Sequence, residues 1–350
     1  MKSKGLGWLS AVAALGVLAW AGAAFAGTAK VYVADEEGDT VTVLDATSFK
    51  KLASISVGRE PHNVQVSPDG RSAWVTINAE VARKGKDPAQ HPGMPREEHE
   101  AMSEVGQAWV IDTATDHVVA KVAVGKHQAH VVLSPEGRFA YVTNGGDDTV
   151  SVVDTASRTT IATIPVGAYP HGIRVSPDGR EAYVANLKGG TVSVIDTEAR
   201  KEAATIGVGK GPAQVGFAPD GRTAFVSLSQ ENAVAIIDPA TRKVMKKVPV
   251  GTVPIQVYAT PDSRLLFVAN QGSKKAPGRT VSVVDLARLE VIKTVETGPG
   301  AHGVVVTTDG RYAFVTNIYA NNVSVIEVAG AKVVATVPVG KGPNGISVTP

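Results

Sequence analysis

Cysteine is absent from the 350 residues, which excludes disulfides, zinc–thiolate sites, iron–sulfur clusters and thiol catalysis together. Aromatic residues make up only 5% of the chain and charged residues only 19%. A coiled coil, a helical bundle or a disordered chain would need more Glu, Lys and Leu, or far fewer β-branched residues. The 43% of hydrophobic residues, together with 36 Gly and 20 Pro, suits short strands and turns instead.

The first 26 residues have the features of a secretory signal peptide. Lys2 and Lys4 precede an apolar run that reaches Phe25, and residues 24–26 form a small-x-small cleavage site. An uncleaved membrane anchor is the alternative, because the run approaches spanning length. We expect a periplasmic or secreted protein with no membrane span after cleavage. Removal of residues 1–26 leaves 33 basic and 33 acidic residues, so net charge does not argue for a nucleic-acid partner.

The rest of the chain is built from a repeat with a period of 42 residues. VGREPHNVQVSPDGRSAWVT begins at Val57, and its variants begin at Val124, Val166, Val208, Val250, Thr297 and Val339. Each unit holds four alternating or β-branched runs separated by turns such as Ser-Pro-Asp-Gly. Four strands in a unit of this length predict one blade of a β-propeller, whereas ankyrin or tetratricopeptide arrays show helical spacing.

The repeat therefore predicts an all-β fold, a seven-bladed β-propeller of four-stranded antiparallel blades over residues 27–350. The last unit stops after one strand, at residues 347–350, while the region after residue 27 holds three strands: KVYVAD, DTVTVLD and KKLASISVG. We expect these N-terminal strands to pair with the C-terminal strand. Such pairing closes the ring and leaves no exposed sheet edge.

One tetrapeptide motif recurs in these units. YVTN at residues 141–144 returns as YVAN at 183–186 and FVTN at 314–317, beside the repeated Ser-Pro-Asp-Gly turn. These residues resemble the YVTN family of seven-bladed β-propellers, over the whole mature chain. The resemblance implies the fold but says little about function, because related propellers serve as binding modules, as subunits beside quinone or haem dehydrogenases, and as metal-bearing reductase domains. Ile77 and Leu228 stand where the motif has Asn.

Most of the repeated acidic residues are expected to be structural. An Asp at the end of the third strand can bond the backbone of the following turn, and the Asp of a Pro-Asp-Gly turn has a similar role. The first set contains Asp45, Asp112, Asp154, Asp196, Asp238 and Asp285.

A polar residue lies near the start of the first strand in every unit, where the strand lies innermost around the central channel. These residues are His62, His130, His171, Gln214, Gln256, His302 and Asn344. We expect them to occupy equivalent sites around the channel mouth, where neutral imidazoles can bind a transition metal or a small anion. The arrangement is similar to that of nitrous oxide reductase, although three positions here are amides. The alternative is a structural ring, with the imidazoles bonded to the backbone of neighbouring blades.

A long insertion, residues 78–105, separates the second and third strands of the unit that begins at Val57. It holds His91, Met94, His99 and Met102, and imidazole with thioether is a ligand set that favours copper. Pro95 suits the first position of a helix, which would put His99 and Met102 on one face. A partner-docking loop, whose Met residues grip another protein, and an inert solvated lid are the alternatives.

Chain topology brings these features together. Successive strands are antiparallel, so the turns between units and the turns between second and third strands must lie at one end of the ring. Basic residues in these turns would concentrate positive charge at the channel mouth, suited to a negatively charged partner, or they are scattered surface residues. They are Lys126, Lys210, Lys274, Lys275, Arg279 and Lys341.

No nucleophile–base motif, P-loop or dinucleotide-binding motif is present. We therefore expect a monomeric, non-catalytic binding propeller that presents one face to a partner protein or a metal, with copper as the favoured cofactor. The first alternative is an accessory propeller of a periplasmic quinone- or cytochrome-linked dehydrogenase. The second is single-stranded nucleic-acid binding on the basic face, which the shortage of aromatic residues weakens.

Overall fold

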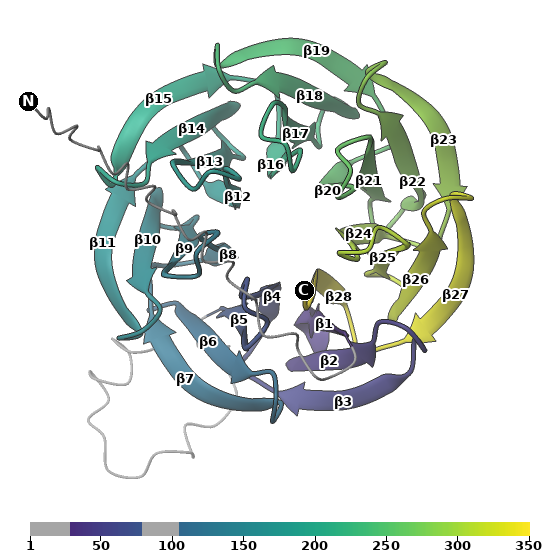
Figure 1. Ribbon diagram of the computed structural model, residues 1–350, viewed down its shortest axis with the longest axis horizontal. Coiled ribbons are helices and arrows are strands. Elements are labelled where there is room, and N and C mark those ends of the chain that lie inside the picture. The colour runs from purple at the N-terminus through teal and green to yellow at the C-terminus, as the bar shows by residue number, and fades with distance from the viewer. Residues whose placement is uncertain (1–28, 79–104) are drawn as a thin grey trace, which may run out of the picture.

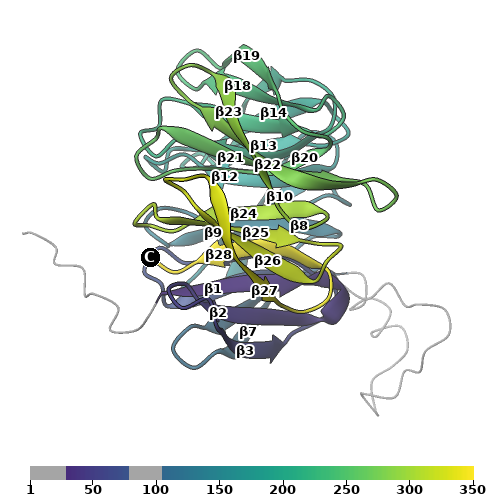
Figure 2. The ribbon, with the colours of Figure 1, turned by 90° about the vertical axis from the view of Figure 1, so that its right-hand side faces the viewer.

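The computed structural model describes residues 29–78 and 105–350. Seven four-stranded antiparallel sheets stand around a central axis as the blades of a ring (Figure 1). The side view shows the sheets of neighbouring blades stacked around that ring (Figure 2). The described residues contain one short 3-10 helix, η1 (Glu36–Gly38), and no α-helix. The seven-bladed all-β prediction is confirmed.

Each blade runs from an inner strand at the channel to an outer strand at the rim. Blade 1 holds β28 (Pro343–Val348), β1 (Lys30–Asp35), β2 (Thr40–Asp45) and β3 (Lys51–Ser56). Blade 2 holds β4 (Pro61–Val66), β5 (Ser72–Ile77), β6 (Gln107–Asp112) and β7 (His117–Ala123). Blade 3 holds β8 (Gln128–Leu133), β9 (Phe139–Asn144), β10 (Thr149–Asp154) and β11 (Thr159–Pro165). Blade 4 holds β12 (Pro170–Val175), β13 (Glu181–Asn186), β14 (Thr191–Asp196) and β15 (Lys201–Gly207).

The other three blades follow the same order. Blade 5 holds β16 (Pro212–Phe217), β17 (Ala224–Leu228), β18 (Ala233–Asp238) and β19 (Lys243–Pro249). Blade 6 holds β20 (Pro254–Ala259), β21 (Leu265–Gly272), β22 (Pro277–Asp285) and β23 (Glu290–Glu296). Blade 7 holds β24 (Ala301–Val306), β25 (Tyr312–Asn317), β26 (Asn322–Glu327) and β27 (Lys332–Pro338).

The two ends of the described chain close the ring in blade 1. β28, from the C-terminus, pairs antiparallel with β1, with Val31 opposite Val348 and Val33 opposite Ile346. This pairing confirms the predicted closure. It also covers the inner edge of β1, so that the second strand of blade 1 is hydrogen-bonded on both sides, as in the other blades.

The core lies between blades rather than in one central mass. The middle strands are buried along nearly their whole length, while the outer strands alternate between exposed and buried residues. Tyr183 and Val194 of blade 4, for example, share a cluster with Val215 and Val226 of blade 5. A sheet covered on both faces needs apolar side chains on both, which explains why these strands read as continuous Val, Ala and Ile runs.

The Asn of the repeated tetrapeptide fastens the second strand to the third. Asn144 Nδ2 donates to Thr149 Oγ1 at 3.0 Å and to Ser151 Oγ at 2.9 Å, and its Oδ1 accepts the Gly125 N–H at 3.0 Å. The glycine is required by space, because a Cβ on Gly125 would lie 2.5 Å from Asn144 Cγ. The repeated Val-Gly and YVTN motifs are therefore two halves of one contact.

We expect Gly251→Ala, at the same place in blade 6, to lower the free energy of unfolding by about 1–3 kcal/mol. Its Cβ would lie 2.5 Å from Cγ of the buried Asn270. Equilibrium urea denaturation measures the change. Gly207→Ala is the matched control, because no atom lies within 4 Å of a Cβ built there, and we expect a change within about 0.5 kcal/mol. Equal losses in both variants would contradict the spatial argument.

Blade 1 carries Asp35 in place of the Asn. Its Oδ1 accepts the Gly340 N–H at 3.0 Å and its Oδ2 accepts the Thr42 hydroxyl at 2.7 Å. Burial raises the pKa of Asp35 above its ordinary 3.8, by more than the hydrogen bonds from Thr42, Thr40 and Gly340 lower it. A carboxyl group whose pKa is higher in the folded protein than in the unfolded chain costs stability above the folded pKa. This cost disappears at a pH below the unfolded pKa.

We therefore expect Asp35→Asn to raise the free energy of unfolding at pH 7, because no charge is then buried and the amide can donate to the hydroxyls of Thr40 and Thr42, as Asn144 does to Thr149 and Ser151. The gain should shrink as the pH falls toward about 3, where the wild-type carboxyl group is protonated in both states. Urea denaturation of both proteins across this range measures the difference. A gain that does not change with pH, or a loss at pH 7, would contradict the argument.

Candidate functional site: three histidines at the channel mouth

The turns between blades and the turns between second and third strands meet at one end of the ring. Backbone hydrogen bonds join them in successive blades: Gly145 N–H donates to His127 O, Leu187 N–H to Tyr169 O, and Ile318 N–H to Gly300 O. The expectation that they share a face is thus confirmed for the described turns. We call this end of the channel the mouth, since the inner strands begin here.

The seven predicted ring residues occupy two register positions, not the one equivalent position that we expected. Pro61 opposite Ile77 corresponds to Gln128 opposite Asn144, so His62 is the second residue of its strand and His130 the third. The second position holds His62, His171, His302 and Asn344, and the third holds His130, Gln214 and Gln256.

The physical reason for the two positions lies in how closely inner strands approach each other. A Cβ on Gly172, which follows His171, would lie 2.5 Å from Ala213 O of the next blade. A Cβ on Gly303, which follows His302, would lie 2.4 Å from Asn344 O. In β12 and β24 the His at the second position is therefore followed by Gly, and in β4 it is followed by Asn63, whereas β8 has Ala129 second and His130 third.

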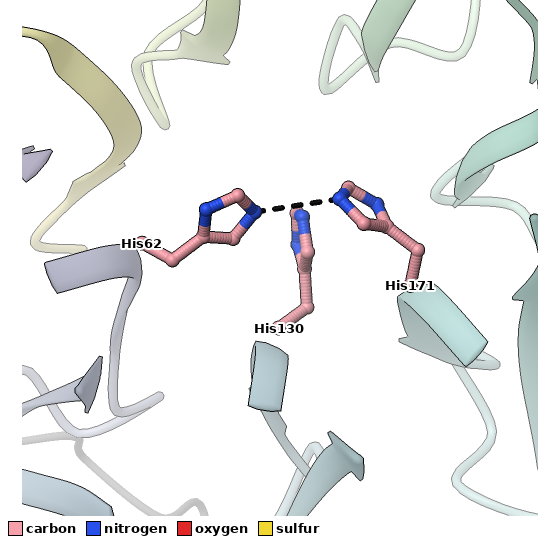
Figure 3. Close-up of side chains that lie close together, drawn as sticks. All are labelled: His62, His130 and His171. Atoms are coloured by element: carbon pink, nitrogen blue, oxygen red, sulfur yellow. Dashed lines mark hydrogen bonds between the residues drawn. The ribbon is translucent and has the colours of Figure 1, made fainter. Parts of the chain in front are cut away.

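Three of these histidines converge over the channel. His62, His130 and His171 extend from β4, β8 and β12 and point toward one another (Figure 3). Their ring centroids lie 4.9–5.7 Å apart, and one ligand nitrogen of each lies within 4.8 Å of the other two. Among the residues that the structure describes, they form the one group with metal-ligand geometry.

Two of the facing nitrogens are acceptors when their rings are neutral. His171 Nδ1 lies 2.9 Å from the Ala213 carbonyl oxygen and must donate to it, which leaves Nε2 with its lone pair. His62 Nδ1 lies 3.2 Å from Glu36 Oε1 and donates to it, so its Nε2 is likewise free. These two Nε2 atoms lie 3.4 Å apart. Ligands about 2.0–2.1 Å from a tetrahedral metal ion are separated by about this distance. Two lone pairs at this distance call for a shared cation, either a metal ion or a proton.

Glu36 is the acidic residue of the site, and the sequence analysis missed it. It lies in η1, directly after Asp35, and reaches the mouth from the turn between β1 and β2. Its Oε2 accepts from Asn344 Nδ2 at 2.7 Å. Burial alone would raise the pKa of Glu36, but the hydrogen bond and charge of His62 and the Asn344 bond outweigh it and bring the pKa to about 2. Glu36 is therefore an ionised carboxylate that orients the His62 ring.

Burial keeps the other imidazoles in the form that binds metals. It lowers the pKa of His171 to about 4, with the neighbouring charge of His62 adding to the effect. It also lowers the pKa of His302 to about 3 and the pKa of His130 well below its ordinary value. A neutral imidazole offers a lone pair without first losing a proton, so these rings are poised as ligands near pH 7.

Several buried polar atoms at the mouth have no protein partner. His302 is 6% exposed and His130 2% exposed. The unpartnered atoms at the mouth belong to Gln128, His130, Gln256, His302 and Asn344. Buried polar groups are normally bonded, so a cluster of unbonded ones around a channel indicates water or a bound polar ligand.

The other predicted site residues are those of the insertion and the basic residues of the turns. His91, Met94, His99 and Met102 lie outside the described residues, as do residues 1–26. The turn lysines lie beside acidic residues: Lys126 N–H donates to Asp147 Oδ2 at 2.7 Å, and Lys210 N–H donates to Glu231 Oε1 at 2.6 Å. The rest of the predicted set belongs to the β27–β28 turn or the β21–β22 hairpin: Lys341, Lys274, Lys275 and Arg279. At the Lys126 and Lys210 turns, therefore, an acidic residue lies beside the basic one.

These observations define a seven-bladed propeller with a polar, histidine-bearing channel mouth. The chain belongs to the YNCE-like beta-propeller family, which matches residues 108–229 and 273–349. This agrees with the resemblance to YVTN-repeat propellers. No helix among the described residues has the length and apolar character needed to cross a membrane.

Several solved structures share the fold at low sequence identity. A chain of Kuenenia stuttgartiensis hydrazine synthase is 23% identical, with a TM-score of 0.68 over 82% of this chain and 89% of its own. A functionally unknown protein from Desulfotomaculum acetoxidans is 17% identical, with a TM-score of 0.73 over 91% and 98%. Dihydro-heme d1 dehydrogenase NirN is 17% identical, with a TM-score of 0.64 over 91% and 74%.

One curated relative matches by sequence. Antigen Lp49 of Leptospira interrogans is 27% identical over 124 residues, which make up 35% of this chain and 25% of the antigen. The match thus spans about a quarter of the relative's length.

Proposed function

We propose that this protein is an exported, non-catalytic propeller that binds a divalent transition metal ion through His62, His130 and His171 and presents that face to a partner protein. The observation that carries the proposal is the pair of nitrogens, His62 Nε2 and His171 Nε2, held 3.4 Å apart, a distance at which two lone pairs need a cation between them. His130 Nε2, buried and without a protein partner, supplies the third donor.

Copper is the metal that this ligand set favours. Three imidazoles suit copper and zinc, and the Irving–Williams order places Cu²⁺ above Zn²⁺ for a given nitrogen site. Three protein ligands leave one position of a tetrahedral ion for water or a ligand. Glu36 supplies the carboxylate that commonly orients a ligating histidine.

A redox enzyme is the partner class that we favour. Two propellers of similar shape are named as a hydrazine synthase and a dehydrogenase, which supports an accessory role beside a quinone- or cytochrome-linked dehydrogenase. Single-stranded nucleic acid is disfavoured, because the two aromatic residues of the described mouth turns already have partners within the protein. Tyr169 has Lys188 Nζ 4.0 Å from its ring centroid, and the Tyr319 hydroxyl accepts from Gln271 Nε2. Export rests on the predicted signal peptide.

Metal retention tests the proposal directly. The mature protein, loaded with Cu²⁺ or Zn²⁺ and dialysed, should retain about one ion per chain by elemental analysis. His130→Ala and His171→Ala should each lower the affinity at least about tenfold, because two imidazoles bind much more weakly than three. His117→Gln, which changes an exposed histidine on β7, is the matched control and should bind as the wild type does.

A second variant locates the metal. The combination of His91→Ala, Met94→Leu, His99→Ala and Met102→Leu removes the His/Met set of the insertion and should leave the retained ion in place. If this variant loses the ion while His171→Ala keeps it, the metal belongs to the insertion and not to the channel mouth. If the wild type retains no ion, a shared proton joins His62 and His171 instead, and the metal proposal fails.

We expect Glu36→Gln to weaken metal binding by about 10–100-fold, because the carboxylate fixes the His62 ring and raises its basicity. Glu37→Gln is the control, since this neighbour is exposed and forms no hydrogen bond or ion pair with the described histidines. Isothermal titration with Zn²⁺ at pH 7 measures both. Equal affinities for the two variants would show that Glu36 does not position the ligand.

A further inference from the structure

A second group of polar residues lies deeper in the channel, at the fifth residue of three inner strands, β4, β12 and β20. In β4, β12 and β20 the second and fifth residues are partly exposed while their neighbours are buried, which identifies them as the positions facing the channel. The fifth residues of these strands are Gln65, Arg174 and Tyr258. A strand rises about 3.3 Å per residue, so the Arg174 backbone lies about 10 Å deeper than that of His171.

Arg174 is a channel cation without a described acidic partner. Its Nη1 donates to Gln65 Oε1 at 3.2 Å, and its Cζ lies 5.7 Å from the centroid of the Tyr258 ring. Gln65 is neutral and uses its own amide group to donate to Val66 O and Ser347 Oγ. A guanidinium group has five N–H donors, and the structure gives Arg174 one hydrogen bond to described residues.

The other half-buried cation among the described residues, Lys30, is paired with a carboxylate. Its Nζ lies 2.8 Å from Asp116 Oδ2. No described carboxylate lies within 4.0 Å of the Arg174 guanidinium group. Desolvation lowers the pKa of Arg174, and the group nevertheless stays protonated at neutral pH. Taking a charge out of bulk water without a counter-charge is costly, so an occupant that restores the balance is favoured.

We propose that Arg174, with Gln65 and Tyr258, forms a binding site for a small free oxyanion inside the channel. The guanidinium fork matches two oxygens of a planar oxyanion such as nitrate or a small carboxylate. The guanidinium group also lies over the Tyr258 ring, whose face attracts a cation. The fifth residues of the other four inner strands are uncharged: Val132, Gly216, Val305 and Ser347. The site rests on other residues than the metal site, so either can exist without the other.

Anion-dependent stability tests the site in the full mature protein, stripped of metal with EDTA. Sodium nitrate and sodium acetate should raise Tm relative to sodium chloride at equal ionic strength, because a ligand that binds only the folded protein stabilises it. Isothermal titration should give saturable binding of nitrate to the wild type, and Arg174→Gln should weaken it at least about tenfold. Arg180→Gln is the matched control, since this arginine is exposed and lies beside Asp178.

Two further variants separate the loss of the anion site from misfolding and from the loss of the metal site. Arg174→Lys keeps the charge but loses the two-pronged guanidinium group, and we expect it to lose most of the nitrate response as well. It replaces Arg174→Gln as the test if that variant does not fold. His130→Ala should respond to nitrate as the wild type does, even where it fails to retain metal. A wild type that responds to nitrate no more than to chloride overturns the site, as does an unchanged response in both Arg174 variants.

Discussion

The close approach of seven inner strands around one axis determines most of what this molecule can do. The strands lie so near one another that a Cβ on Gly172 or Gly303 would meet the carbonyl oxygen of the next blade. Side chains from separate blades therefore meet across the channel, although they are far apart in sequence. His62 and His171 are 109 residues apart and their Nε2 atoms lie 3.4 Å from each other. Closure of the ring by β28 beside β1 completes the mouth. It places Asn344 of β28 beside Glu36 of the β1–β2 turn, and the two side chains are hydrogen-bonded there.

The repeat allowed the fold to be predicted because the same physical requirement returns in every blade. Each blade needs two buried sheet faces, a turn after each strand and a fastening between its middle strands. The Asp residues that end the third strands accept backbone N–H groups of the following turn, as expected: Asp196, for example, accepts from Glu198 and Ala199. The Asn of the tetrapeptide and the Gly of the turn that opens the same unit form one contact, 19 residues apart in blade 3. Such residues recur for packing and not for chemistry.

The candidate site was only partly predictable, and each shortfall has a physical cause. The histidines near the start of the inner strands were predictable from the repeat, but their register was not. His62 is the second residue of its strand and follows Pro61, whereas His130 is the third residue of its strand and follows Ala129. Glu36 belongs to a turn whose counterpart in other blades starts with Asn, Gly, Leu, Ser, Gln or Ile, so only alignment by register reveals it as an unusual acid. Arg174 reads as an ordinary polar residue of an alternating strand. Its lack of a carboxylate partner is a property of the assembled channel.

The charges of the channel link its two levels. At neutral pH the described mouth holds one ionised carboxylate, Glu36, against one deeper guanidinium, Arg174, while burial keeps His171 and His302 neutral. A divalent ion on three neutral imidazoles would add two positive charges, of which Glu36 offsets one. The channel then carries an excess of positive charge in surroundings less polar than water, where an anion gains more from attraction than it would in bulk solvent. Metal binding and anion binding should therefore favour each other by the same factor in both directions, since coupling between two sites is reciprocal.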